Sequence, residues 1–157
     1  MSKVAEGKKV PDFVYTATGG EHGKLSKLKG QRILLYFYPK DNTPGCTREG
    51  QAFRDKYRSF SRMKTRIYGI SRDSVASHEK FKSKQEFPFE LITDEDETLC
   101  KMFDVIKMKN MYGKQVRGIE RSTFLIDESG ILQKVWRKVK VDGHADDVID
   151  AVKALKK

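Results

Sequence analysis

The feature that most constrains the fold of this 157-residue sequence is a run of six apolar residues, Ile33 to Tyr38 (ILLYFY). A strand with one face in water alternates apolar and polar residues, whereas this run is apolar on both faces. It is far too short to cross a bilayer as a helix, which takes about 20 apolar residues. Pro39 follows directly and ends the strand, because proline cannot donate to a ladder. The run therefore predicts a central strand covered on both faces.

Apolar spacing on either side of this strand predicts that strands and helices alternate along the chain. No internal repeat or long linker interrupts the pattern, so residues 1–157 are expected to form one α/β domain around a mixed sheet. The expected strands are Phe13–Ala17, Arg66–Ser71 and Phe87–Ile92, with a hairpin of Ser122–Asp127 and Ile131–Val139. One expected helix follows Gly45, with Phe53, Tyr57 and Phe60 on its inward face. The other expected helices are Val75–Phe81, Asp94–Met102 and, last in the chain, Ala145–Leu155.

The net charge of +10 leaves two interpretations open. One is a surface for nucleic acid or an acidic membrane, and the other is a well-solvated surface. The densest basic stretches, IKMKNMYGKQVRG at 106–118 and KVWRKVKV at 134–141, alternate with apolar residues and lack a nucleic-acid-binding motif. We therefore favour the solvated surface and expect neither a nucleic-acid nor a membrane partner.

The N-terminal stretch MSKVAEGKKVPDF has no apolar segment typical of a secretory signal. Two cysteines in such a chain do not make a disulfide framework. A reducing, cytoplasmic setting is the expectation.

Cys46 lies where a helix is expected to begin. Pro44 suits the first helical position and Thr43 the N-cap before it, so Cys46 falls in the first turn. There the helix dipole favours an anion and stabilises a thiolate. Cys46 precedes Phe53 by two helical turns and shares its inward face, so we expect the sulfur to be partly sheltered at the mouth of a pocket. From position alone, a small buried apolar residue is an equally good interpretation.

Pro39, Thr43 and Cys46, in PKDNTPGCT, match the P-x-x-x-T-x-x-C active-site pattern of peroxiredoxins. The stretch YFYPKDNTPGCTREGQAFRD resembles the bacterioferritin-comigratory, or Q-type, branch of that family. Further matches are SRDSVASHEKF at 71–81, FELITDEDETLCKMFDV at 89–105 and GIERSTFLID at 118–127. The resemblance implies a thioredoxin-like three-layer sandwich with an added N-terminal hairpin. It also implies a thiol peroxidase that reduces hydrogen peroxide and organic hydroperoxides without a metal or a flavin.

The resemblance also implies a role for five residues. Cys46 would be the peroxidatic nucleophile, Thr43 would present its hydroxyl to thiolate and peroxide, and Arg121 would hold the thiolate and the departing oxygen. Pro39 would shield the sulfur from water, and Glu49 would orient the arginine. From the residues alone, Thr43 could be only a cap, Arg121 only a surface charge and Glu49 only an acid that complements the helix dipole.

The sequence departs from its relatives at the second cysteine. Many Q-type members place a resolving cysteine five residues after the first, where this chain has Gln51, and others place it where Lys82 and Ser83 stand. Cys100 is spaced with Leu99 and Phe103 on one helix face and is expected in the core. We therefore expect a monomer with a one-cysteine cycle, reduced by thioredoxin, glutaredoxin or a small thiol.

Three other functions are weighed against the peroxidase. A disulfide reductase of the thioredoxin type needs a C-x-x-C pair, but Thr47, Arg48 and Glu49 follow Cys46. A metal site is poorly supported, because His22, His78 and His144 are far apart in the sequence and unpaired with cysteine. A basic, non-enzymatic interaction or nucleic-acid-binding module that keeps the fold is the alternative from another class.

Overall fold

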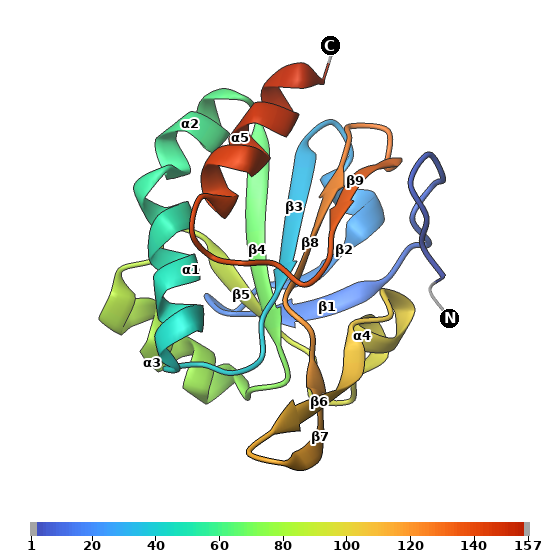
Figure 1. Ribbon diagram of the computed structural model, residues 1–157. Helices are drawn as coiled ribbons and strands as arrows, with labels where there is room; N and C mark the ends of the chain where they lie inside the picture. Colours follow the sequence, from blue (N-terminus) through green and yellow to red (C-terminus); the bar gives the residue numbers. More distant parts are fainter. Residues whose placement is uncertain (1–2, 156–157) are drawn as a thin grey trace.

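A computed structural model of the chain describes residues 3–155, and its strands and helices alternate as expected (Figure 1). The strands are β1 (Val14–Ala17), β2 (His22–Lys24), β3 (Arg32–Phe37), β4 (Thr65–Ser71), β5 (Glu90–Thr93), β6 (Ile106–Met111), β7 (Lys114–Ile119), β8 (Ser122–Ile126) and β9 (Leu132–Trp136). The helices are α1 (Pro44–Asp55), α2 (Tyr57–Arg62), α3 (Val75–Gln85), α4 (Thr98–Met102) and α5 (His144–Ala154), with a 3-10 turn at Leu25–Leu28.

Strand β3 is the central strand that the apolar run predicts, since every one of its residues is buried. It pairs in parallel with β4, which sets Leu35 opposite Tyr68, and antiparallel with β8, which sets Leu35 opposite Phe124. The sheet has seven strands in the order β2-β1-β5-β4-β3-β8-β9. It is therefore a mixed sheet, with long buried strands in the middle and shorter ones at its edges.

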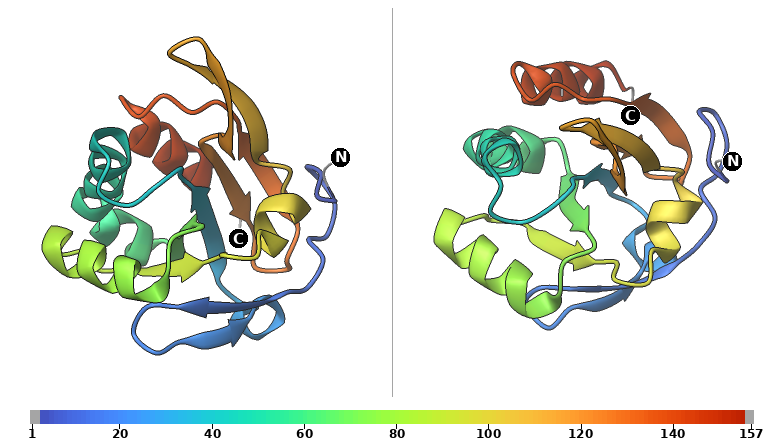
Figure 2. Two further views of the ribbon diagram at one scale, coloured as in Figure 1. Left: turned by 90° about the horizontal axis from the view of Figure 1, so that it is seen from below. Right: turned by 60° about the horizontal axis from the view of Figure 1, so that its bottom comes forward.

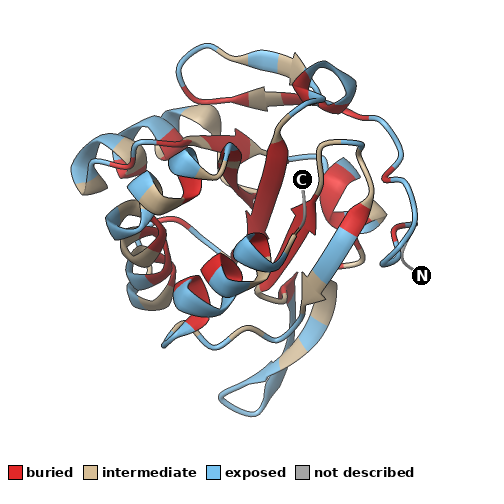
Figure 3. Cartoon of the chain, turned by 90° about the horizontal axis from the view of Figure 1, so that it is seen from above, coloured by how far each residue is buried: buried red, intermediate tan, exposed pale blue. Residues whose placement is uncertain are grey.

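Alternate side chains of β3 enter two separate apolar cores. Ile33, Leu35 and Phe37 belong to the first core, which we call the α4-side core, and Leu34 and Tyr36 to the second, the α1-side core. The α1-side core is covered by helices α1, α2, α3 and α5, through Phe53, Phe60, Phe81 and Val148 respectively. Helix α4 and the N-terminal segment cover the α4-side core, so the molecule has three layers (Figures 2 and 3). This confirms the three-layer sandwich.

The N-terminal hairpin is also present. Strands β1 and β2 pair antiparallel, with Tyr15 opposite Gly23, and β1 joins the sheet by pairing antiparallel with β5. Gly23 is needed there, because a Cβ at this position would meet the Tyr15 ring at 2.4 Å. The hairpin thus extends one edge of the sheet.

Several predicted element bounds differ from the structure, and β5, for example, begins at Glu90 where a strand from Phe87 was expected. The expected helix after Gly45 breaks at Lys56, whose φ of −103° and ψ of 4° end α1 before α2 begins. Helix α4 begins at Thr98, four residues later than expected, because the Asp94 side chain accepts from the N–H groups of Leu99 and Cys100 at 3.0 and 2.8 Å. The final hairpin strand ends at Trp136, short of Val139.

Sequence patterning missed the two-stranded sheet of β6 and β7, which projects from the body of the molecule (Figure 1). Most of its residues are exposed or half-buried on both faces, so its alternation of basic and apolar residues does not mark a face packed on a core. Across residues 3–155 no helix combines the length and the apolar content that crossing a bilayer demands.

Candidate active site

Cys46 occupies the first turn of α1, which begins at Pro44 as the sequence predicts. Its side chain is only 2% exposed and belongs to the α1-side core with Tyr36 and Phe53. The thiol is therefore buried more deeply than the pocket mouth expected from the sequence. Packing at the positive end of the helix dipole combines an apolar wall with backbone N–H groups that favour an anion.

Arg121 lies beside this sulfur. It follows β7 and directly precedes β8, and its Nη2 donates to Cys46 Sγ at 3.6 Å. Its Nη1 donates to Glu49 Oε1 at 2.7 Å. Burial opposes the charge of Arg121, but Glu49 and Cys46 outweigh it, and together they raise the pKa of the guanidinium. The structure therefore brings Cys46, Glu49 and Arg121 together around a permanent positive charge.

Gly45 provides the room for this arrangement, which the sequence analysis did not foresee. A Cβ at this position would lie 3.1 Å from Arg121 Nη2. A side chain immediately before the cysteine would therefore push the guanidinium by a few tenths of an ångström from its position beside the sulfur. The Pro-Gly-Cys order carried this signal.

Glu49 is a buried carboxyl with one partner. Its side chain is 1% exposed, and burial, opposed by Arg121, raises its pKa from the ordinary 4.5 to about 7. Among the described residues its Oε2 atom has no hydrogen-bond partner, and neither does the Tyr36 hydroxyl. Burial, followed by the charge of Glu49 and Cys46, raises the pKa of Tyr36 well above its usual value. The pKa values of both Glu49 and Tyr36 are thus raised chiefly by burial in this site.

Thr43 and Pro39 lie in the loop between β3 and α1. Thr43 occupies the N-cap position but does not cap the helix, so that prediction was wrong for its side chain. Its hydroxyl instead donates to the Lys40 carbonyl at 2.8 Å. A hydroxyl that donates in this way can still accept a hydrogen bond. Pro39 is half-buried and follows directly after the buried Tyr38.

Lys109 adds a second positive charge near Cys46, and the sequence motif does not include this residue. It lies on β6, and burial, followed by the charge of Arg121, lowers its pKa. Cys46 opposes that shift, which places the lysine within electrostatic reach of both the sulfur and the guanidinium. Its only sequence signal was membership of the basic stretch at 106–118.

The positions where relatives carry a second cysteine have ordinary structural roles here. Gln51 Nε2 donates to Gln85 Oε1 at 2.9 Å, which links α1 to α3. Lys82 Nζ forms an ion pair with Glu90 Oε1 at 2.9 Å. Cys100 is fully buried in the α4-side core, as predicted, and burial followed by the Asp94 carboxylate raises the pKa of its thiol. The central sheet therefore separates Cys46 from Cys100.

Comparisons with known proteins identify the family of the chain. A model of the AhpC/TSA family matches residues 6–135. Peroxiredoxin Bcp of Xanthomonas campestris pv. campestris is 53% identical over 143 residues, which are 91% of this chain and 89% of that protein. Peroxiredoxin Bcp of Bacillus subtilis is 49% identical over 149 residues, 95% of each chain.

Solved structures show the same likeness. A mutant peroxiredoxin Q from Xylella fastidiosa superposes with a TM-score of 0.92 at 44% identity and covers 98% of both chains. The bacterioferritin comigratory protein of X. campestris, described with its alkyl peroxide reduction activity, gives a TM-score of 0.86 at 52% identity over 90% of both chains. The chain therefore belongs to the AhpC/TSA family, within its branch of Bcp- and Q-type peroxiredoxins.

Proposed function

We propose that the chain reduces hydrogen peroxide and organic hydroperoxides with Cys46 as its nucleophile. The Cys46 thiolate attacks one peroxide oxygen, the O–O bond breaks, and the second oxygen takes a proton and leaves as water or an alcohol. Cys46 becomes a sulfenic acid. The X. campestris protein described with alkyl peroxide reduction supports organic hydroperoxides as substrates. The observation that carries the proposal is the Arg121 guanidinium, 3.6 Å from Sγ.

Arg121 supplies what this reaction needs beyond a nucleophile. Negative charge moves from the sulfur to the departing oxygen, and a fixed cation beside both atoms stabilises it in the transition state. A planar guanidinium can donate to two atoms at once, which a lysine ammonium does less well. Glu49 acts as the positioning residue that holds the other arm of the guanidinium at 2.7 Å.

Thr43 and Pro39 complete the proposed site. The Thr43 hydroxyl, which already donates to Lys40, accepts a hydrogen bond from the peroxide hydroxyl and orients it. Pro39 has no N–H and shields the sulfur and its sulfenic acid from water. Both roles rest on the match of these residues to the peroxiredoxin pattern.

Recycling is proposed to use an external thiol, such as thioredoxin, glutaredoxin or a small thiol. The first thiol attacks the sulfenic sulfur, releases water and forms a mixed disulfide with Cys46. A second thiol then attacks that disulfide, which restores the Cys46 thiol and leaves the reductant oxidised. We place this cycle in a monomer in the cytoplasm, where such reductants are maintained.

Cys46→Ser is the direct test. We expect the variant to fold as the wild type does and to lose peroxide consumption with dithiothreitol as reductant. Dimedone should label the wild-type protein at Cys46 after one equivalent of peroxide, and mass spectrometry should find almost no label in the variant. Normal thiol-dependent turnover by Cys46→Ser would contradict the proposal.

Arg121→Lys tests the guanidinium. The charge remains but the planar fork that donates to two atoms at once is lost, so we expect the oxidation of Cys46 to slow by about 10- to 1,000-fold, as when an oxyanion donor is removed. Stopped-flow mixing with peroxide measures the rate constant, and circular dichroism checks the fold. A lysine variant as fast as wild type would reduce Arg121 to a neighbouring charge.

A further inference from the structure

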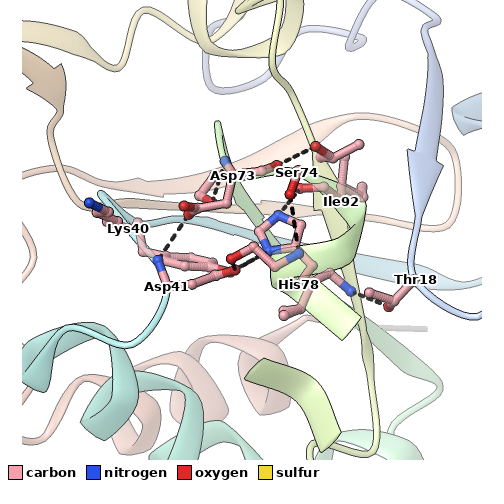
Figure 4. A network of polar contacts seen from close by, with 12 residues as sticks. Thr18, Lys40, Asp41, Asp73, Ser74, His78 and Ile92 are labelled. Carbon is pink, nitrogen blue, oxygen red and sulfur yellow. Dashed lines mark hydrogen bonds and ion pairs between the residues drawn. The ribbon is translucent and has the colours of Figure 1, made fainter. Parts of the chain in front are cut away.

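A second cluster of buried polar residues lies directly behind the loop that carries Pro39 and Thr43. Its centre is Asp41, which is 4% exposed, and its partner on α3 is His78, which is 0% exposed. Figure 4 shows Asp41 on the loop after β3, Asp73 on the segment that leads into α3, His78 on α3 itself, and Ile92 on β5. Nothing in the proposed chemistry uses these groups, so their presence calls for another explanation.

Both oxygens of the Asp41 carboxyl group take part in hydrogen bonds. Its Oδ1 atom accepts from the Tyr38 hydroxyl at 2.6 Å. Its Oδ2 atom accepts from the Ser77 hydroxyl and lies opposite His78 Nδ1, each at 2.8 Å. The backbone N–H of Asp41 in turn donates to Asp73 Oδ2 at 2.9 Å. The main chain of Asp41 is therefore held by Asp73, just before α3. Its side chain is held by Ser77 and His78, on α3 itself.

The hydrogen bonds also locate the protons of His78. Its Nε2 lies 3.0 Å from the Ile92 carbonyl, which can only accept, so Nε2 donates. Its Nδ1 faces a carboxylate oxygen, so a proton lies between those two atoms as well. A buried hydrogen bond therefore joins the ring of His78 to the carboxyl group of Asp41.

Oxygen and nitrogen atoms of Asp41, Asp73 and His78 come within 4.8 Å of one another, a spacing that could also hold a metal ion. The contacts favour the hydrogen-bond network instead. Both ring nitrogens of His78 already have acceptors, and the facing oxygens of Asp41 and Asp73 already have donors. A metal ligand needs a ring-nitrogen lone pair directed at the ion, whereas Nε2 donates to Ile92 and Nδ1 lies in direct hydrogen-bond contact with Asp41.

A buried polar or ionic pair is weak evidence for stability, because removing its groups from water offsets their attraction. Such pairs can instead specify one conformation. The loop held here contains Asn42 at a φ of 64°, a left-handed turn that asparagine tolerates and that redirects the chain toward α1. Asp41 immediately precedes that residue, and α1 with Cys46 begins two residues after it.

We propose that His78 is a positioning residue for peroxide reduction, which acts through Asp41 on the loop between β3 and α1. This rests on the proposed role of Cys46. Arg121 reaches the site from the start of β8, whereas Thr43 and Cys46 reach it from this loop and α1. The distance between sulfur and guanidinium therefore depends on how firmly the loop is held. His78 ties the loop to α3 and, through Ile92, to β5 in the central sheet.

The test uses three substitutions at His78 and two rates measured on Cys46. His78→Leu removes both donors. His78→Asn places an amide N–H near the position of Nδ1 and keeps the contact with Asp41, whereas His78→Gln reaches toward Ile92 and loses Asp41. One rate is the oxidation of Cys46 by hydrogen peroxide, which needs the aligned loop and arginine. The other is alkylation by iodoacetamide, which needs only an accessible thiolate.

We expect His78→Leu and His78→Gln to slow oxidation by about 10- to 100-fold, the effect of a small misplacement of reacting groups. Alkylation should change by less than about threefold, and His78→Asn should recover oxidation to within about threefold of wild type. Helix propensity ranks glutamine above asparagine, so a purely structural effect on α3 would give the opposite order. Equal oxidation rates for the Asn and Gln variants would overturn the proposal.

Ser74→Ala is the matched control. Ser74 caps α3 by accepting from the Ser77 N–H at 3.1 Å, and no described contact links its side chain to Asp41. This variant should lower the unfolding temperature and leave the oxidation rate unchanged. If slower oxidation merely followed the loss of stability, Ser74→Ala would slow as well and the proposal would fail. If His78→Leu does not fold, the Asn and Gln pair still decides. Failure of the peroxidase itself would show separately, as wild-type protein that peroxide does not oxidise at Cys46.

Discussion

Glu49 is a carboxyl group that the fold places in an apolar core with Arg121 as its ionic partner. Burial raises its pKa to about 7 while Arg121 opposes that shift, so the protonation of this group differs between the folded and unfolded chain. Its free Oε2 atom leaves part of the desolvation uncompensated. The residue thus links the geometry of the proposed site to the stability of the protein.

A pH dependence of stability follows from Glu49. Between its ordinary pKa of 4.5 and about 7, the folded protein holds a proton there that the unfolded chain has released. The free energy of unfolding should therefore fall as pH rises through this window, by up to about 3 kcal/mol. Glu49→Gln should remove most of that slope. Urea unfolding at pH 5, 6, 7 and 8 measures both profiles, and parallel profiles would contradict this account.

At the scale of elements, the β6–β7 hairpin shows a turn that its sequence does not favour. Met111 pairs with Lys114, so Tyr112 and Gly113 form a two-residue loop, with φ values of 54° and 80°. Two positive φ values identify a type I′ turn, whose preferred sequence is Asn-Gly or Asp-Gly. Tyr112 is 99% exposed and gains no packing to offset its left-handed backbone.

Tyr112→Asn should therefore stabilise the hairpin by about 0.5–1 kcal/mol, because asparagine tolerates this conformation. Hydrogen exchange at the amides of β6 and β7 should slow by about two- to fivefold, the equivalent of that free energy. Gly113→Ala is the opposite control, since it puts a Cβ at a φ of 80° and should speed exchange. Unchanged exchange in both variants would mean that the turn does not limit opening.

The same hairpin could not be predicted from the sequence, whereas the central strand and the site loop could. The ILLYFY run identified β3, because a strand buried on both faces needs an apolar residue at every position. The Pro-x-x-x-Thr-x-x-Cys spacing identified the loop and α1. The hairpin buries few of its side chains, so its apolar pattern did not identify it. Its turn sequence, Tyr-Gly, is only a weak signal for a hairpin. Asp41 and His78 lie 37 residues apart, and only the β3–β4 pairing and the course of α3 bring them together. No local pattern could predict that contact.

At the scale of the whole molecule, the sheet places the two thiols in different cores. Cys46 belongs to the α1-side core and Cys100 to the α4-side core. A disulfide needs the two Cα atoms within about 7 Å, so joining these sulfurs would require the layers to separate.

Cys100→Ser should therefore keep most of the peroxidase activity with dithiothreitol. Dimedone should label this variant as strongly as the wild type, because the sulfenic acid on Cys46 finds no partner thiol in its own chain. Non-reducing peptide mapping after one turnover measures any bridge directly. A quantitative disulfide between Cys46 and Cys100 would make Cys100 the resolving cysteine and refute the one-cysteine cycle.

The separation of the two thiols has a kinetic consequence. A sulfenic acid without an internal thiol has two bimolecular fates: an external thiol returns it to the cycle, or a second peroxide converts it irreversibly to the sulfinic acid. The first rate scales with the reductant concentration and the second with the peroxide concentration. The number of turnovers before inactivation therefore depends on the ratio of the two. Doubling both concentrations would hasten the loss of active protein in time but leave the turnovers completed by each molecule unchanged.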